Sequence, residues 1–142
     1  IDHAFVRSQL KDLNERFKIR EIAFDRWGAG EISVALQGDG FTLVEFGQGF
    51  ASMSAPMKEM LSLILAGRLS HGGNPVMTWN AASVTALQDA AGNVKPVKPD
   101  RQKSANRIDG IVALIMGLAR AIANGANQES VYQKRGVRVL EW

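Results

Sequence analysis

The 142-residue chain contains no cysteine, which excludes disulfide bonds and thiolate metal sites. Any bound metal must therefore be held by oxygen or imidazole ligands, and two histidines without a cysteine are a poor donor set for zinc. No apolar run is long enough to span a membrane, and the first residues lack the basic-then-apolar pattern of a secretion signal. A Gly-x-x-x-x-Gly-Lys-Ser/Thr phosphate loop is also absent, so ATP hydrolysis is not expected. These absences fit a chain of a reducing cytosol that neither spans a membrane nor hydrolyses ATP.

The composition is that of one soluble globular domain with a mildly basic surface. Hydrophobic residues make up 46% of the chain and charged residues 22%, which is enough apolar material for one packed core. The net charge of +3 is compatible with a polyanionic partner. Five cations, opposed only by Asp100, form what we call the basic strip: Lys95, Lys98, Arg101, Lys103 and Arg107. Such a strip either contacts phosphate groups or lies on a solvated loop, and an adjacent metal site favours the first reading.

Asp109 stands at the start of the most regular helical pattern in the chain. Apolar residues recur with a period of 3.6 residues from Ile108 to Ile122, which predicts a core-packed helix over 106–124 that ends at Gly125. A carboxylate in the first turn of such a helix can simply complement the helix macrodipole. It gains interest because a second aspartate lies in an equally unusual setting.

Asp25 follows a short apolar segment, residues 19–24, that is typical of a largely buried strand. Ligands of open α/β sheets bind outside the carboxyl ends of the strands, which is where Asp25 is expected. The alternative is an ordinary turn or cap aspartate ahead of Gly28 and Gly30. Taken together, Asp25 and Asp109 are the two candidates for a carboxylate site.

The remaining pattern alternates helices with short strands, as α/β folds do. A strand, a helix and a strand over 19–24, 31–37 and 42–46 predict a right-handed parallel unit, with the second strand buried on both faces. Two strand candidates, 84–87 and 94–97, flank a turn rich in loop formers and predict a β-hairpin. The other expected elements are an amphipathic helix over 1–18 capped by Asp2, a helix from 54 or 55 to 67 with Pro56 in its first turn, a short extended segment over 68–71, a helix starting at Asn74-Pro75, and a strand over 137–140 within a polar tail.

Three polar residues are weaker candidates for function. His71, in a loop that precedes two glycines, is suited to contacting DNA or a phosphate, although such a histidine more often bonds its own loop. Gln48 stands between two glycines, which allow either a close backbone approach to a ligand or a tight turn. Asp89 is expected to serve its own hairpin turn.

Six short segments stand in a distinctive order along the chain. They are Ala23-Phe-Asp-Arg-Trp27, Phe46-Gly-Gln-Gly49, Ser52-Met-Ser-Ala-Pro-Met-Lys58, Gly67-Arg-Leu-Ser-His-Gly-Gly-Asn-Pro75, Asp89-Ala-Ala-Gly-Asn-Val-Lys-Pro96 and Lys103-Ser-Ala-Asn-Arg-Ile-Asp-Gly-Ile-Val-Ala113. This ordered series closely resembles the C-terminal nuclease domain of the large terminase subunit of tailed bacteriophages and prophages. The resemblance runs from about residue 1 to residue 124.

The resemblance implies an α/β, ribonuclease H-like nuclease fold with three layers, helices on both sides of the sheet and a β-hairpin. Residues 1–125 would form the nuclease domain and residues 126–142 a C-terminal tail. The implied activity is cleavage of concatemeric double-stranded phage DNA during packaging, with Mg²⁺ or Mn²⁺ in a two-metal mechanism. The implied setting is the cytoplasm of an infected or lysogenic bacterium, with the small terminase subunit and the portal protein as partners of the full-length protein and no membrane.

The resemblance also assigns roles to residues of this sequence. Asp25 matches the second metal-binding acid of the family and Asp109 the third, so both are expected to hold metal and to be catalytic. The expected DNA contacts are Lys98, Lys103, Arg107, His71 and Gln48.

The chain departs from the family at its start. In the family, three antiparallel strands come first, and the first of them carries the first metal-binding acid. No such strands precede the helix expected over 1–18, so we expect an incomplete two-metal site and slow or no DNA cleavage by this chain alone. The main alternative is a catalytically incomplete fragment that binds DNA or other packaging proteins. An unrelated α/β enzyme that acts on a small molecule is a third alternative, for which the sequence contains no motif.

Overall fold

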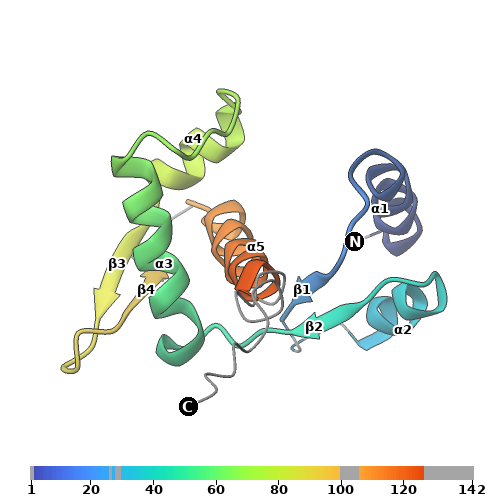
Figure 1. The fold of residues 1–142 in the computed structure, drawn as a ribbon, viewed down its shortest axis with the longest axis horizontal. Helices are drawn as coiled ribbons and strands as arrows, with labels where there is room; N and C mark the ends of the chain where they lie inside the picture. The colour runs from blue at the N-terminus through green and yellow to red at the C-terminus, as the bar shows by residue number, and fades with distance from the viewer. Residues whose placement is uncertain (1, 26, 28–29, 100–105, 127–142) are drawn as a thin grey trace, which may run out of the picture.

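A computed structural model describes residues 2–25, 27, 30–99 and 106–126. Figure 1 shows α5 in the middle of the molecule, with α3, α4 and the β3–β4 hairpin on one side and α1, β1, β2 and α2 on the other. No helix in this part of the chain is long and apolar enough to cross a membrane. The elements are α1 (His3–Phe17), β1 (Ile22–Phe24), α2 (Gly30–Gly38), β2 (Leu43–Glu45), α3 (Phe50–Leu65), α4 (Pro75–Ala82), β3 (Thr85–Gln88), β4 (Val94–Val97) and α5 (Asp109–Ala126).

The core of the protein is the seam between α3 and α5. Met53 and Met60 of α3 pack against Ile111, Ile115 and Met116 of α5. Ile115 is completely enclosed and Met53 is 1% exposed. Burying an apolar side chain of this size contributes roughly 1.5–3 kcal/mol, so this seam is the main anchor of α5. The apolar stripe expected on the last helix is therefore confirmed as its inward face as far as Ala119, whereas Ile122 at its end is 46% exposed.

β1 and β2 form a parallel pair, as the sequence predicts. Ile22 lies opposite Leu43 and Phe24 opposite Glu45. The ladder extends one step further, because the Phe46 N–H donates to the Phe24 carbonyl at 2.8 Å. Parallel pairing places the carboxyl ends of both strands at one edge of the sheet. The expectation that β2 is buried on both faces is wrong: it is only half-buried, because the pair has no further strand beside it in the described residues.

The β3–β4 hairpin is antiparallel, as expected, and is attached to α3. The Ser54 hydroxyl accepts a hydrogen bond from the Val94 N–H at 3.1 Å. One turn later on α3, the Lys58 ammonium donates to the Gly92 carbonyl at 2.9 Å. These two bonds fix β4 along α3, so that the hairpin becomes one wall of the site described below.

Two helix starts follow directly from their capping residues. The Asp2 carboxylate accepts from the N–H groups two and three residues further on, at 2.9 and 3.1 Å. The Asn74 side chain does the same at 3.0 Å, with Pro75 in the first helical position. Both caps satisfy N–H groups that have no acceptor within the helix, and both confirm the predicted starts.

The predicted start of α3 is wrong. The helix begins at Phe50, after Gly49, so that Pro56 lies inside it instead of in its first turn. A proline inside a helix removes one backbone hydrogen bond. The longer helix nevertheless buries Met53 almost completely in the core, and this burial offsets the loss.

Several other boundaries also differ from the expected ones. β1 covers only the last three of the residues 19–24, and residues 68–71 form no strand. α5 starts at Asp109 and includes Gly125, where the helix was expected to stop. The strand expected over 137–140 lies outside the described residues, as does nearly all of the tail.

The α/β class and the hairpin are confirmed. The strands of the described residues pair as two separate two-stranded sheets, one parallel and one antiparallel. They do not form the broad central sheet that an arrangement of three layers requires. The three-layer, ribonuclease H-like assignment therefore stays a prediction.

Candidate functional site

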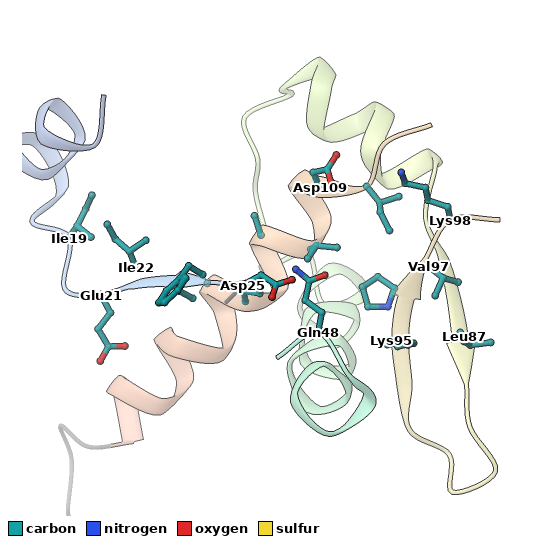
Figure 2. Close-up of a pocket in the computed structure, with 18 of the residues that line it drawn as sticks. Ile19, Glu21, Ile22, Asp25, Gln48, Leu87, Lys95, Val97, Lys98 and Asp109 are labelled. Atoms are coloured by element: carbon teal, nitrogen blue, oxygen red, sulfur yellow. The ribbon is translucent and has the colours of Figure 1, made fainter. Parts of the chain in front are cut away.

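A cavity of about 1460 Å³ opens between the carboxyl end of β1, the N-terminal half of α5 and the hairpin (Figure 2). Its lining includes both predicted acids, Asp25 and Asp109, together with Gln48. Two cations of the hairpin side, Lys95 and Lys98, line it as well. Segments that are far apart in the sequence thus bring the two predicted acids and two ammonium groups to one space, which Glu21 also lines.

Asp25 is the first residue after β1 and is half-buried. Its carboxylate accepts a hydrogen bond from the Trp27 N–H at 3.2 Å, which orders the turn that leaves the strand. Figure 2 shows this carboxylate and the Gln48 side chain facing the same part of the cavity. Both residues also line a smaller hollow of about 500 Å³, together with Glu45 of β2. The parallel pairing of β1 and β2 explains this grouping, because all three residues lie at the carboxyl edge of the pair.

Asp109 is the first residue of α5 and is exposed. The preceding Ile108 is 7% exposed and anchors the helix start in the core. Its carbonyl accepts the first helical hydrogen bond, from the Val112 N–H at 3.0 Å. In Figure 2 the Asp109 carboxylate stands at the N-terminal end of α5 and points away from Asp25. The two acids share a cavity, but their carboxylates do not face each other.

Asn80 is a residue of the site region that the sequence analysis missed. It lies on α4, is 3% exposed, and accepts a hydrogen bond from the Gly110 N–H at 2.8 Å. The only signal in the sequence is a polar residue at a helical position that would otherwise be apolar. That signal does not reveal the partner, which is thirty residues away.

The basic strip is only partly within the described residues. The Lys95 ammonium lies 4.8 Å from the centre of the Phe50 ring, a cation–π contact that holds this side chain beside α3. Lys98 is half-buried at the cavity, whereas Arg107 is exposed and is not part of the cavity lining. Arg101 and Lys103 lie outside the described residues.

Two of the three weaker candidates, His71 and Asp89, lie away from the cavity. His71 is exposed in the loop between α3 and α4 and does not line the cavity. Asp89 accepts hydrogen bonds from the N–H groups of Ala91 and Asn93, at 2.9 and 2.8 Å, and from the Asn93 side chain at 2.9 Å. The bonds from Asn93 are the main reason that the pKa of Asp89 is lowered. Its carboxylate is thus occupied by its own turn, as expected.

A half-buried ion pair joins Glu21, the residue before β1, to Arg120 in the C-terminal half of α5. Arg120 donates to the Glu21 carboxylate at 2.7 Å, and the two side chains are 30% and 18% exposed. The hydrogen bond from Arg120 lowers the pKa of Glu21, so this carboxylate stays ionised at neutral pH. Because Glu21 also lines the cavity, the pair keeps β1, and Asp25 at its end, in place beside α5.

Comparisons with known proteins identify relatives over most of this chain. A family model described as "Terminase large subunit, endonuclease domain" matches residues 1–125. The chain is 37% identical over 123 residues to the large terminase subunit of Enterobacteria phage HK97. This match covers 85% of this chain and 24% of that protein. It is 36% identical over 122 residues to protein YmfN of Escherichia coli strain K12, covering 86% and 27%. The crystal structure of the HK97 large terminase matches with a TM-score of 0.72 at 37% identity, over 84% of this chain and 25% of that chain. The chain therefore spans about a quarter of the length of these relatives.

Proposed function

The chain belongs to the family of terminase large-subunit endonuclease domains, as its ordered motifs predict, and from this premise we propose that it hydrolyses double-stranded DNA with divalent metal ions. One observation carries the proposal. Asp25 and Asp109 are 84 residues apart in the sequence, yet they line the same cavity, together with Lys95 and Lys98. Carboxylates that hold cations and ammonium groups that contact phosphates are the side chains that this chemistry requires.

The donor set around the cavity fits magnesium or manganese. Both ions prefer carboxylate oxygens, and magnesium is commonly held by only one or two carboxylates, with water and substrate phosphate completing its shell. Within the described residues, no three acidic or histidine side chains are close enough to hold one ion together. Asp25 and Asp109 are therefore the proposed ligands of an open site, with the Gln48 side chain facing the same part of the cavity as Asp25.

When bound, a divalent ion would supply Lewis-acid stabilisation of the phosphoryl oxygens and an activated water. The side chains of this chain would hold the metal ion and orient the DNA. Asp25 and Asp109 supply negative charge at the cavity, while Lys95 and Lys98 offer contacts to backbone phosphates. Phosphate contacts position DNA without reading its bases, so cleavage without strong sequence preference is part of the proposal. So are a two-metal mechanism and a ribonuclease H-like fold.

The biological setting is also proposed from the family. The HK97 relative is a phage terminase large subunit. By analogy, we propose that the protein containing this chain cuts concatemeric DNA during phage packaging in the bacterial cytoplasm. The small terminase subunit and the portal protein are the proposed partners.

The proposal is tested first by metal binding. We expect Asp25→Asn and Asp109→Asn each to weaken Mn²⁺ binding by more than about tenfold, since even outer-shell changes cost 10–100-fold. Electron paramagnetic resonance of free Mn²⁺ measures the affinity, and a cooperative unfolding transition checks the fold. Asp12→Asn, which removes a carboxylate from an exposed position of α1, is the control and should leave the affinity unchanged.

Cleavage is the second test. Supercoiled plasmid incubated with the 142-residue chain and millimolar Mn²⁺ should be nicked slowly or not at all, and any nicking should disappear in Asp25→Asn and Asp109→Asn. Nicking that persists in both variants, or Mn²⁺ binding that neither variant weakens, would contradict the proposed site. Metal and DNA binding without any nicking would support the metal site and a binding role, but not cleavage by this chain alone.

A further inference from the structure

The N-terminal end of α5 is held by a buried asparagine of α4. The Asn80 side chain is 3% exposed, and both ends of its amide are bonded. Its oxygen accepts from the Gly110 N–H at 2.8 Å, and its nitrogen donates to the Val76 carbonyl of its own helix at 3.0 Å. Because the second bond fixes the amide relative to α4, the first bond transfers the position of α4 to the first turn of α5.

Gly110 makes this contact possible. A Cβ atom at position 110 would lie 3.2 Å from the Asn80 amide oxygen and 3.5 Å from its Cγ atom. The first distance is shorter than an ordinary van der Waals contact, and the buried amide has little room to retreat. The two helices therefore meet closely at the residue that directly follows Asp109.

Asp109 itself is exposed, so the packing of its own side chain does little to define its position. Its backbone is instead defined by its two neighbours. Ile108 is anchored in the core on one side, and Gly110 is bonded to Asn80 on the other. A shift of the Gly110 amide would move the Asp109 Cα atom, and with it the carboxylate at the rim of the cavity.

We propose that Asn80 is a positioning residue that sets the place of Asp109 relative to the cavity and thereby the affinity of the site for a divalent cation. The inference rests on the proposed function, because it assigns Asp109 a role in holding the ion. If the amide acted only as a helix cap, its loss would lower the stability of the protein. The metal affinity of the molecules that remain folded would then be unchanged. These two readings are separable by experiment.

The test compares Asn80→Leu with a matched control, Ser83→Ala. Ser83 is also on the α4 side, is 2% exposed, and donates its hydroxyl to the Trp79 carbonyl at 2.8 Å, a bond that stays within α4. Both variants remove one buried polar side chain, but only the first removes a bond to α5. We expect Asn80→Leu to weaken Mn²⁺ binding about 10–100-fold, as outer-shell changes do. Ser83→Ala should stay within about twofold of the unaltered chain on the same scale.

Gly110→Ala provides a second variant in case Asn80→Leu does not fold. It keeps Asn80 but adds a methyl group on α5 that crowds the Asn80 amide, so it should also weaken Mn²⁺ binding. Hydrogen exchange of the Gly110 amide gives a readout without metal, and it should be faster in Asn80→Leu than in Ser83→Ala.

Each outcome decides between the readings. If Asp109→Asn weakens Mn²⁺ binding but Asn80→Leu and Gly110→Ala do not, the positioning role is wrong while the proposed function stands. Equal weakening by Asn80→Leu and Ser83→Ala would also overturn it, because the effect would then follow general loss of packing. If Asp25→Asn and Asp109→Asn bind Mn²⁺ as well as the unaltered chain, the proposed function itself fails. Faster Gly110 exchange in Asn80→Leu would in that case make Asn80 a helix cap only.

Discussion

Asp39, directly after α2, links this helix to α1. Its carboxylate accepts two hydrogen bonds from the Arg7 guanidinium, at 2.8 and 2.9 Å, and lies 2.9 Å from the Lys11 ammonium. The hydrogen bonds from Arg7 and then from Lys11 lower the pKa of Asp39 from 3.8 to about 2. Since no residue of α1 is buried, this ionic cluster is a principal attachment of that helix.

The lowered pKa of Asp39 predicts how stability depends on pH. A depressed folded-state pKa stabilises the protein above the unfolded-state value near 3.8, and this contribution is lost as the pH falls toward about 2. We expect Asp39→Asn to be less stable than the unaltered chain at pH 5 to 7, with the difference shrinking between about pH 4 and pH 2. Urea denaturation at a series of pH values measures this difference. Asp12→Asn is the control, and a constant difference across the whole range would contradict the assignment.

Single residues differ in how far the sequence reveals their roles. The role of Asp89 is predictable because its partners, Ala91 and Asn93, are its own neighbours in the turn. The role of Asn80 is not, because its partner Gly110 is brought to it by the packing of α4 on α5. The position of Asp25 at the end of a strand is predictable from the sequence. The direction in which its carboxylate points relative to the other acids is not.

At the scale of elements, α5 offers a matched pair of glycines. A Cβ atom at Gly117 meets nothing within 4 Å, whereas one at Gly110 meets the Asn80 oxygen at 3.2 Å. Alanine is favoured over glycine inside a helix by about 1 kcal/mol. We therefore expect Gly117→Ala to raise the free energy of unfolding by up to about 1 kcal/mol, measured by urea denaturation.

Gly110→Ala should show no such gain. The added methyl group displaces a buried amide, and leaving a buried donor or acceptor without its bond costs about 1–3 kcal/mol, which outweighs the helix preference. Equal stabilisation by both substitutions would mean that the Asn80 amide adapts without losing its bond to Gly110.

The ends of the elements show which signals the sequence carries. α1 and α4 begin where local chemistry dictates, at Asp2 and Asn74, whose side chains bond the first turn. α3 begins at Phe50, six residues before Pro56, and Gly49 supplies no side-chain cap. Its start is decided by the burial of Met53 against α5, a tertiary effect that no local pattern reports.

At the scale of the whole molecule, the site depends on contacts between distant segments. The parallel β1–β2 pair brings Asp25 and Gln48 together, and the α3–α5 seam places Asp109 at the same cavity. The sequence predicts the pair and the inward face of α5. It does not predict that α3 carries the hairpin, through Ser54 and Lys58, to the opposite wall. For this reason Lys95, which the sequence analysis places only in the basic strip, is found at the cavity itself.

The cavity cations lead to an expectation for DNA binding by the whole domain. Each phosphate contact contributes about 0.9 to the slope of log affinity against log salt for duplex DNA. Because Lys95 and Lys98 both line the cavity, the double variant Lys95→Ala/Lys98→Ala should lower that slope by up to about 1.8. Binding should weaken about equally for unrelated sequences, since phosphate contacts carry no base information. Fluorescence anisotropy with labelled duplexes at several salt concentrations measures both effects.

The matched control for this experiment is Arg16→Ala/Arg68→Ala, which removes two exposed cations that do not line the cavity. It changes the net charge of the protein by the same amount, so it reports the general electrostatic attraction that any basic protein exerts on DNA. The slope should fall clearly less than for Lys95→Ala/Lys98→Ala, because nonspecific attraction is spread over the surface whereas cavity contacts are direct. Equal slopes for the two double variants would mean that DNA does not enter the cavity, and would remove the DNA-contacting role from Lys95 and Lys98 while leaving the metal-binding test of Asp25 and Asp109 unaffected.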